Sequence, residues 1–143
     1  MSTAPQTAEK RTPLYALHRQ LGARMIHFGG WEMPVSYSGI IEEHQAVRAH
    51  AGLFDVSHMG EIDIRGPQAE AAVQYLTLND VRTLENYHLQ YSAMCNEAGG
   101  IIDDLTVCRL AADHFLLVVN ASNIATDFAW ITQHLLPGAE AHN

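Results

Sequence analysis

The sequence predicts an α+β fold, with antiparallel sheets and helices packed on one face. Residues 58–66 alternate between polar and apolar side chains, which is typical of a half-exposed strand. Two further strand patterns, "LQYSAMCN" and "IIDDLTVCRL", flank the turn sequence "EAGG" and predict a hairpin over residues 89–110. Apolar side chains at helical spacing predict two helices that cover the sheet, one through Ala69, Ala72, Val73 and Leu76, the other through Ile124, Phe128, Ile131 and Leu135.

Composition limits the functions that this chain of 143 residues can have. Eight basic residues stand against 16 acidic ones, for a formal net charge of −8. Binding to nucleic acid or to an anionic membrane needs a basic surface, so we expect neither. No apolar run approaches the ~20 residues of a membrane span, and the polar opening lacks a secretory signal, so we expect a cytoplasmic protein. The histidines and the two cysteines match no metal-binding motif, and we expect no metal.

The first part of the chain is expected to be one piece of a domain. Residues 1–11 form a polar tail that we predict to be disordered, and residues 12–57 follow as the folded piece. Thr12 and Pro13 are typical of a helix start, and Gly22 of a helix end. A second helix is predicted from about Gly39 to Ala51, and residues 28–39 between the helices indicate a loop or an edge strand. These elements find few partners within the chain, so this first domain is predicted to be incomplete.

The second part, residues 58–143, has the order strand, helix, three strands, helix. A sheet of this kind normally receives another strand after its last helix. The chain ends at "PGAEAHN", shortly after that helix, and we therefore expect this domain to lack its last strand.

Two adjacent aspartates interrupt the apolar strand "IIDDLTV". Neighbouring strand residues point to opposite faces, so Asp103 shares its face with Leu105 and Val107, while Asp104 shares the other face with Thr106. A carboxylate among aliphatic side chains costs several kcal/mol unless it is paired or hydrogen-bonded. Asp103 is therefore either a functional group or a structural one that ties down the glycine turn or pairs with an arginine. The residues alone leave both readings open.

Longer stretches resemble a known family. The run from "TPLYALHRQLGARMIHFGGWEMPVSYSG" to "FDVSHMGEIDIRG", followed by "LTLNDV", "YSAM", "GGIIDDLTV" and "LLVVNASN", is similar to the N-terminal part of the glycine cleavage system T protein family. The resemblance covers residues 12–136 in register. It implies a split folate-binding domain ending near residue 57 and a ferredoxin-like domain after it, with the remaining domains of the family absent from this chain.

The resemblance also implies a reaction. In this family of aminomethyltransferases, an aminomethyl group is attached to the lipoyl arm of the H protein. Its methylene carbon is transferred to tetrahydrofolate, and ammonia is released. The expected partners are therefore the lipoylated H protein and the missing T-protein domains, with tetrahydrofolate as the acceptor. The family's catalytic carboxylate is expected at Asp103, where burial without a cation would raise its pKa towards the range of a general base. The folate-binding positions carried over are Met59, Tyr91, Leu105, Val107, Val118 and Asn120.

Three other readings remain open at this stage. The chain could be a non-catalytic folate-binding relative of the kind linked to iron–sulfur assembly or tRNA modification. It could belong to the folate-dependent demethylases, which carry a flavin domain before this region, although the short polar tail at the start of the sequence leads us to expect no such domain. It could also be inert alone, because half a domain and a sheet edge would stay without partners.

Overall fold

The structure is a computed structural model that describes residues 9–143. The chain forms two compact units, one that ends at His58 and one that begins at Met59. Most of the tail predicted over residues 1–11 lies outside the described residues. Its last part, Lys10–Arg11, is strand β1, so the predicted tail extends too far at this point.

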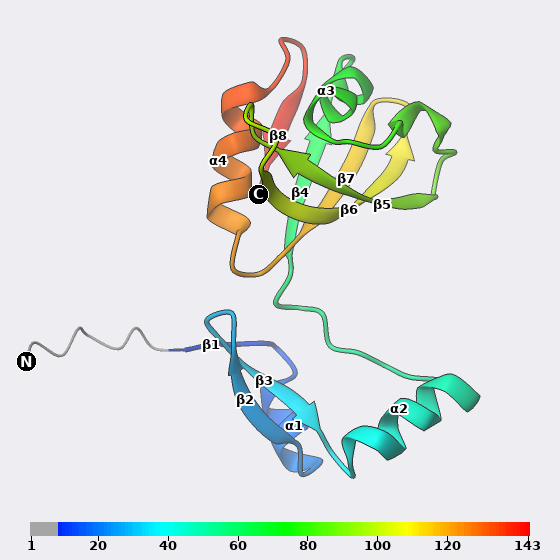
Figure 1. The fold of residues 1–143 in the computed structure, drawn as a ribbon, viewed down its shortest axis with the longest axis vertical. Coiled ribbons are helices and arrows are strands. Elements are labelled where there is room, and N and C mark those ends of the chain that lie inside the picture. The colour runs from blue at the N-terminus through cyan, green and yellow to red at the C-terminus, as the bar shows by residue number, and fades with distance from the viewer. Residues whose placement is uncertain (1–8) are drawn as a thin grey trace, which may run out of the picture. The chain divides into compact units, whose positions relative to one another are not determined.

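The first unit contains a small sheet and two helices (Figure 1). Its elements are β1 (Lys10–Arg11), α1 (Tyr15–Gln20), β2 (Arg24–Phe28), β3 (Trp31–Ser36) and α2 (Ile40–Ala49). The strand order is β1-β3-β2, with β1 parallel and β2 antiparallel to β3. Gly29 and Gly30 make the turn between β2 and β3 at φ values of 57° and 85°, which glycine adopts without steric cost. The sequence pattern predicted both helices but only a loop or an edge strand where this hairpin lies.

A buried histidine ties the last segment of this unit to α1. His18 Nε2 lies 2.7 Å from Asp55 Oδ2, and its Nδ1 lies 2.6 Å from the Tyr37 hydroxyl. Burial raises the pKa of Asp55, but hydrogen bonds from His18 and Ser57 outweigh it and hold that pKa well below its usual range. The rest of the unit is poorly covered, since α2 has no buried residue among those described.

The second unit is a five-stranded antiparallel sheet with two α-helices (Figure 1). Its elements are β4 (Gly60–Arg65), α3 (Ala69–Leu76), a 3-10 turn η1 (Val81–Thr83), β5 (Leu89–Cys95), β6 (Ile101–Ala111), β7 (His114–Val119), α4 (Ile124–His134) and β8 (Glu140–His142). The strand order is β5-β6-β7-β4-β8. Strands β8, β4, β7 and β6 follow the ferredoxin-like order, and β5 extends the sheet at one edge.

The end of the chain differs from the sequence expectation. We expected no strand after the last helix, but β8 pairs antiparallel with β4, with Ala141 opposite Ile64. This strand has three residues, and it is too short and too polar to show an alternating hydrophobic pattern in the sequence. The carbonyl of Gly138 accepts a hydrogen bond from the Gln68 N–H at 3.2 Å, which holds the turn before β8 against the start of α3.

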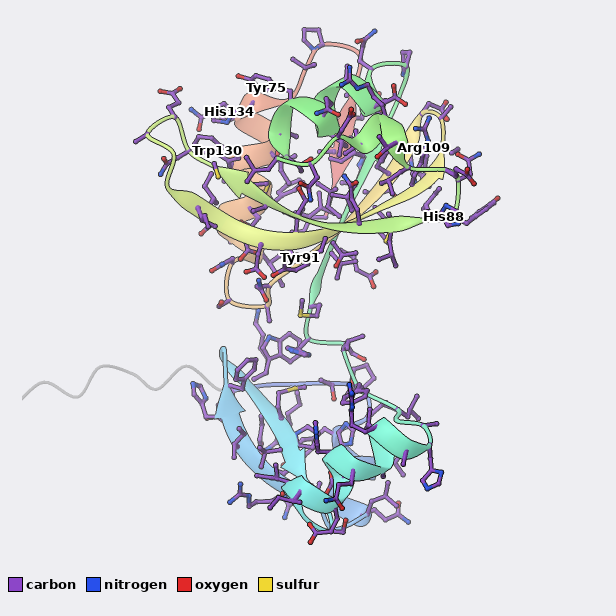
Figure 2. All side chains as sticks on the ribbon, turned by 45° about the vertical axis from the view of Figure 1, so that its right-hand side comes forward. Tyr75, His88, Tyr91, Arg109, Trp130 and His134 are labelled. Carbon is purple, nitrogen blue, oxygen red and sulfur yellow. The ribbon has the colours of Figure 1, made fainter. Side chains whose placement is uncertain are left out.

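Both α-helices of this unit cover one face of its sheet, as Figures 1 and 2 show. The core lies between that face and the helices, and the largest fully buried apolar side chains in it are Ile62, Ile64, Val73, Val81, Met94, Leu105, Val107, Phe115, Leu117, Val119 and Ile131. We call the other side of the sheet the open face. The predicted α+β class, with antiparallel sheets and helices on one face, is confirmed. Among the described residues, none of the helices has the length and apolar character needed to cross a membrane.

Candidate functional site

Asp103 points inward from β6, towards the start of α4. Its side chain is buried, with 4% of the residue exposed, as strand parity predicted. Its Oδ2 accepts the backbone N–H of Asn120 at 2.9 Å, and its Oδ1 accepts the side-chain amides of Asn120 at 3.0 Å and Asn123 at 2.6 Å. Asp103 is therefore surrounded by donors from the segment that enters α4.

These donors reverse the pKa direction that the sequence suggested. Burial alone would raise the pKa of Asp103, but the hydrogen bonds from Asn120 and Asn123 together lower it below the usual range of an aspartate. The strand pattern could not reveal this, because the donors lie 17 and 20 residues further along the chain. Asp103 is thus an ionised, well-anchored group at neutral pH.

Asp104 occupies the open face and is exposed. Its Oδ2 accepts a hydrogen bond from the hydroxyl of Tyr91 on β5, and its Oδ1 lies 3.1 Å from the side-chain nitrogen of Asn120. The Tyr91 ring projects from the side of the sheet opposite to α3 and α4 (Figure 2), and Tyr91 is 65% exposed. The hydrogen bond to Asp104 raises the pKa of Tyr91, so the phenol stays protonated as the donor. We call Tyr91, Asp104 and Asn120 the open-face cluster.

The predicted folate-binding residues lie on opposite sides of the sheet. Leu105 and Val107 share the face of Asp103, as predicted, but that face is packed against the helices and the two residues are 2% and 0% exposed. Tyr91 and Val118 belong to the open face, where Thr106 stands between them in the strand register. The structure therefore does not bring Leu105 and Val107 to the surface that carries Tyr91.

Two predicted residues lie at the margins of this arrangement. Met59 is half-buried and comes directly before β4. Asn120 follows the end of β7 and donates to both aspartates, because its amide nitrogen also lies 3.0 Å from the backbone oxygen of Asp104. Asn120 therefore links the buried carboxylate of Asp103 to the exposed carboxylate of Asp104.

Asp127, in the first turn of α4, is a buried acid that our reading of the sequence missed. It is 0% exposed and lies in hydrogen-bonding reach of Asp103. Burial, together with the hydrogen bond and charge of Asp103, raises the pKa of Asp127 to about 7. A sequence signal did exist, because Asp127 falls between Ile124 and Ile131 on the predicted apolar stripe, where an acid is out of place.

A separate hollow lies on the helix side of this unit. It is lined by Tyr75 from α3, by Cys95 at the end of β5, and by Trp130 and His134 from α4, whose rings stack with centroids 3.8 Å apart. Figure 2 shows Tyr75, Trp130 and His134 on this side and Tyr91 on the other. The hollow thus contains none of the predicted site residues.

Comparison with known proteins identifies the family. The family model described as the GCVT N-terminal domain matches residues 14–143. The chain belongs to this family. A protein named aminomethyltransferase from Desulfitobacterium hafniense (strain DSM 10664 / DCB-2) is 60% identical over 125 residues, which are 87% of this chain and 34% of that protein. Another of the same name from Desulforamulus reducens is 58% identical over 134 residues, 94% of this chain and 37% of that protein.

A solved structure agrees in fold with this member of the GCVT N-terminal domain family. The glycine cleavage system aminomethyltransferase T from Bartonella henselae matches with a TM-score of 0.86 and 42% sequence identity, covering 92% of this chain and 37% of that one. The chain thus spans about a third of the length of the relatives that it matches. The family resemblance seen in the sequence is confirmed.

Proposed function

We propose that this chain supplies the N-terminal third of an aminomethyltransferase of the glycine cleavage system. In the proposed reaction, the methylene carbon of an aminomethyl group on the lipoyl arm of an H protein is transferred to tetrahydrofolate, and ammonia is released. The names of the similar proteins support this reading. We also propose the cytoplasmic location that is expected from the sequence. The other domains of the proposed enzyme would correspond to the parts of the longer relatives that this chain does not match.

The observation that carries the proposal is the open-face cluster. Tyr91 presents an exposed aromatic ring beside the carboxylate of Asp104, and the amide of Asn120 holds that carboxylate from the other side. An aromatic ring can stack on a pterin, and a carboxylate can accept its N–H groups. A carboxylate beside the reacting carbon also stabilises the cationic iminium that forms as ammonia leaves. This surface fits tetrahydrofolate as the acceptor.

The burial of the two aspartates suggests a division of roles. The sequence assigned catalysis to Asp103, but its 4% exposure leaves almost no surface for a substrate. We therefore give the contact with substrate to Asp104 and a positioning role to Asp103. Leu105 and Val107 would stabilise the sheet by packing in the core between the sheet and the helices. Met59, Val118 and Tyr91 stay proposed folate contacts.

A chimera tests both the function and this division. These 143 residues would replace the matching third of the Desulfitobacterium hafniense aminomethyltransferase, and formation of methylenetetrahydrofolate from an aminomethylated H protein would be measured. Asp104→Asn should lower kcat about 10²–10³-fold, the usual range for removing one group that stabilises charge in the transition state. Asp113→Asn, at an exposed turn position, is the matched control and should leave turnover unchanged.

Asp103→Asn separates the alternatives. A loss in Asp103→Asn with full turnover in Asp104→Asn would return the catalytic role to Asp103. Folate binding without turnover in the unsubstituted chimera would instead support the non-catalytic folate-binding alternative. Calorimetric titration of tetrahydrofolate into the isolated 143 residues addresses the inert fragment, since micromolar binding would contradict that reading.

A further inference from the structure

The starting point is an acid that the proposed reaction does not use. Asp127 is fully buried, and among the described residues neither of its carboxyl oxygens accepts a hydrogen bond from a donor. Leaving an ionised carboxylate in this state costs several kcal/mol. Such a group gains a proton unless a cation compensates its charge.

Among the residues that the structure describes, the groups around Asp127 do not supply that cation. The ionisable side chain facing it from the sheet is another acid, Asp103, while Asp104 points to the open face. On β8, which packs against α4, Ala141 is the residue packed against the core, so its neighbours Glu140 and His142 are exposed and point away from Asp127.

Two basic side chains of the elements that carry Asp103 and Asp127, Arg109 on β6 and His134 on α4, have partners of their own. On the α3 side, Arg109 pairs with Glu70 at 2.8 Å, so its charge is already compensated. On α4 itself, His134 lies two turns beyond Asp127, where its Nδ1 bonds the Trp130 carbonyl at 2.8 Å. Within residues 9–143, the charged group that acts on Asp127 is therefore the carboxylate of Asp103.

We propose that Asp127 is a positioning residue, which carries a proton and donates it in a hydrogen bond to the Asp103 carboxylate. Two acids that face each other in a buried site do not both ionise. Asp103 has three other donors and keeps its charge, whereas Asp127 has none and keeps the proton. The raised pKa of Asp127 and the lowered pKa of Asp103 agree with this division.

The bond has a consequence on the other side of the sheet. In this proposal, the carboxylate of Asp103 accepts a hydrogen bond from Asp127 that fixes its orientation. The same carboxylate accepts hydrogen bonds from the backbone N–H and the side-chain amide of Asn120. Asn120 in turn contacts the carboxylate of Asp104. Asp127 would thus orient the open-face cluster without touching a substrate, a role that rests on the function proposed above for that cluster.

Nuclear magnetic resonance of the 143-residue chain, labelled with ¹³C at the aspartate side-chain carboxyls, tests the inference without any folate. The carboxyl of Asp127 should titrate near pH 7, about three pH units above an ordinary aspartate. The Asp103 carboxyl should titrate below the ordinary value. A titration of Asp127 at or below about pH 4 would overturn the proposal.

Two variants test the hydrogen bond itself. In Asp127→Asn the amide still donates to Asp103, so the pKa of Asp103 should stay low and the signals of Asn120 should stay in place. In Asp127→Leu the donor is lost, so the pKa of Asp103 should rise by about 1 pH unit or more and the Asn120 amide should shift. Asp113→Asn is the control and should leave both signals unchanged.

These readouts separate this inference from the proposed function. An unchanged Asp103 titration in Asp127→Leu would refute the hydrogen bond even if the chimera turned over normally. If Asp127→Leu did not fold, the titrations of the unsubstituted chain and of Asp127→Asn would still decide the question. Conversely, a confirmed Asp127–Asp103 bond together with an inactive chimera would overturn only the proposed function.

Discussion

Asn120 and Asp103 contact each other twice, through the backbone N–H of Asn120 at 2.9 Å from Oδ2 and through its amide nitrogen at 3.0 Å from Oδ1. The two bonds join the residue after β7 to the first part of β6. Because the same amide also reaches Asp104, one residue connects the buried face of the sheet with the open face. Any change that loosens this contact should therefore act on both faces.

Truncation of Asn120 should be costly. Asn120→Ala keeps the backbone bond but removes the side-chain donor to a buried charge, so the free energy of unfolding should fall by about 1–3 kcal/mol and the pKa of Asp103 should rise. Urea unfolding at pH 7 measures the first effect. It should be followed by Trp130 fluorescence in a Trp31→Phe background, since these are the two tryptophans of the chain.

Asn143→Ala is the matched control, because that asparagine is exposed at the last position. It should change the unfolding free energy by less than about 0.5 kcal/mol. Equal effects of the two substitutions would mean that the side-chain bond from Asn120 to Asp103 contributes nothing to stability.

Asp127 makes the second unit less stable at alkaline pH. Its pKa in the folded state is raised to about 7, whereas the unfolded chain has an ordinary aspartate pKa near 3.9. The folded state thus binds more protons between these values, and stability falls as pH rises from about 4 through 7. The predicted loss is on the order of 4 kcal/mol, most of it complete by about pH 8.

The measurement is the unfolding free energy from urea titrations at pH values from 5 to 9, again followed by Trp130. Asp127→Asn cannot ionise, so its stability should be flatter over this range and should exceed that of the unsubstituted chain above pH 8. Parallel profiles for both proteins would show that Asp127 is not protonated in the folded state.

The sequence predicted the second unit well because its signals are local and periodic. Alternation placed Asp103 inward and Asp104 outward, and the helical stripes placed α3 and α4 on the core. What local periodicity cannot show is the partner of a side chain. The hydrogen-bond donors to Asp103 come from a segment that is distant in the sequence. The direction in which its pKa is shifted could therefore not be predicted.

The same limit explains the assignment of the pocket residues. Sharing a strand face with Asp103 is equally consistent with a pocket wall and with a packed core, and Leu105 and Val107 lie in the core. The short strands β1 and β8 were missed for another reason. Two or three exposed residues carry no hydrophobic pattern, and only pairing with β3 and with β4 defines them as strands.

In the first unit, acid should weaken the contact between His18 and Asp55. Hydrogen bonds hold the pKa of Asp55 well below its usual range in the folded state. The stability that this gives is present above about pH 4 and is lost as pH falls further. Asp55→Asn should lower the unfolding free energy by about 2 kcal/mol at pH 7 and reduce its dependence on pH in acid.

Trp31 fluorescence in a Trp130→Phe background follows this unit alone. Glu9→Gln is a matched control in the same unit, because Glu9 also pairs with a histidine, His27 at 2.7 Å, but in an exposed position. This control should cost less than about 1 kcal/mol. An Asp55→Asn protein as stable as the control would show that the buried pair is not what holds residues 51–58 in place.

Gly66, at the end of β4, should tolerate no side chain because it lies against the turn before β8. Its φ is +108°, and an added Cβ would lie 2.5 Å from the backbone oxygen of Gly138. Gly66→Ala should lower the unfolding free energy by roughly 2–5 kcal/mol, from backbone strain and overlap together. Gly99 has a similar φ of +82° but nothing within 4 Å, so Gly99→Ala should cost only about 1–2 kcal/mol. Urea unfolding followed by Trp130 compares the two, and equal costs would show that β8 does not pack against this corner as described.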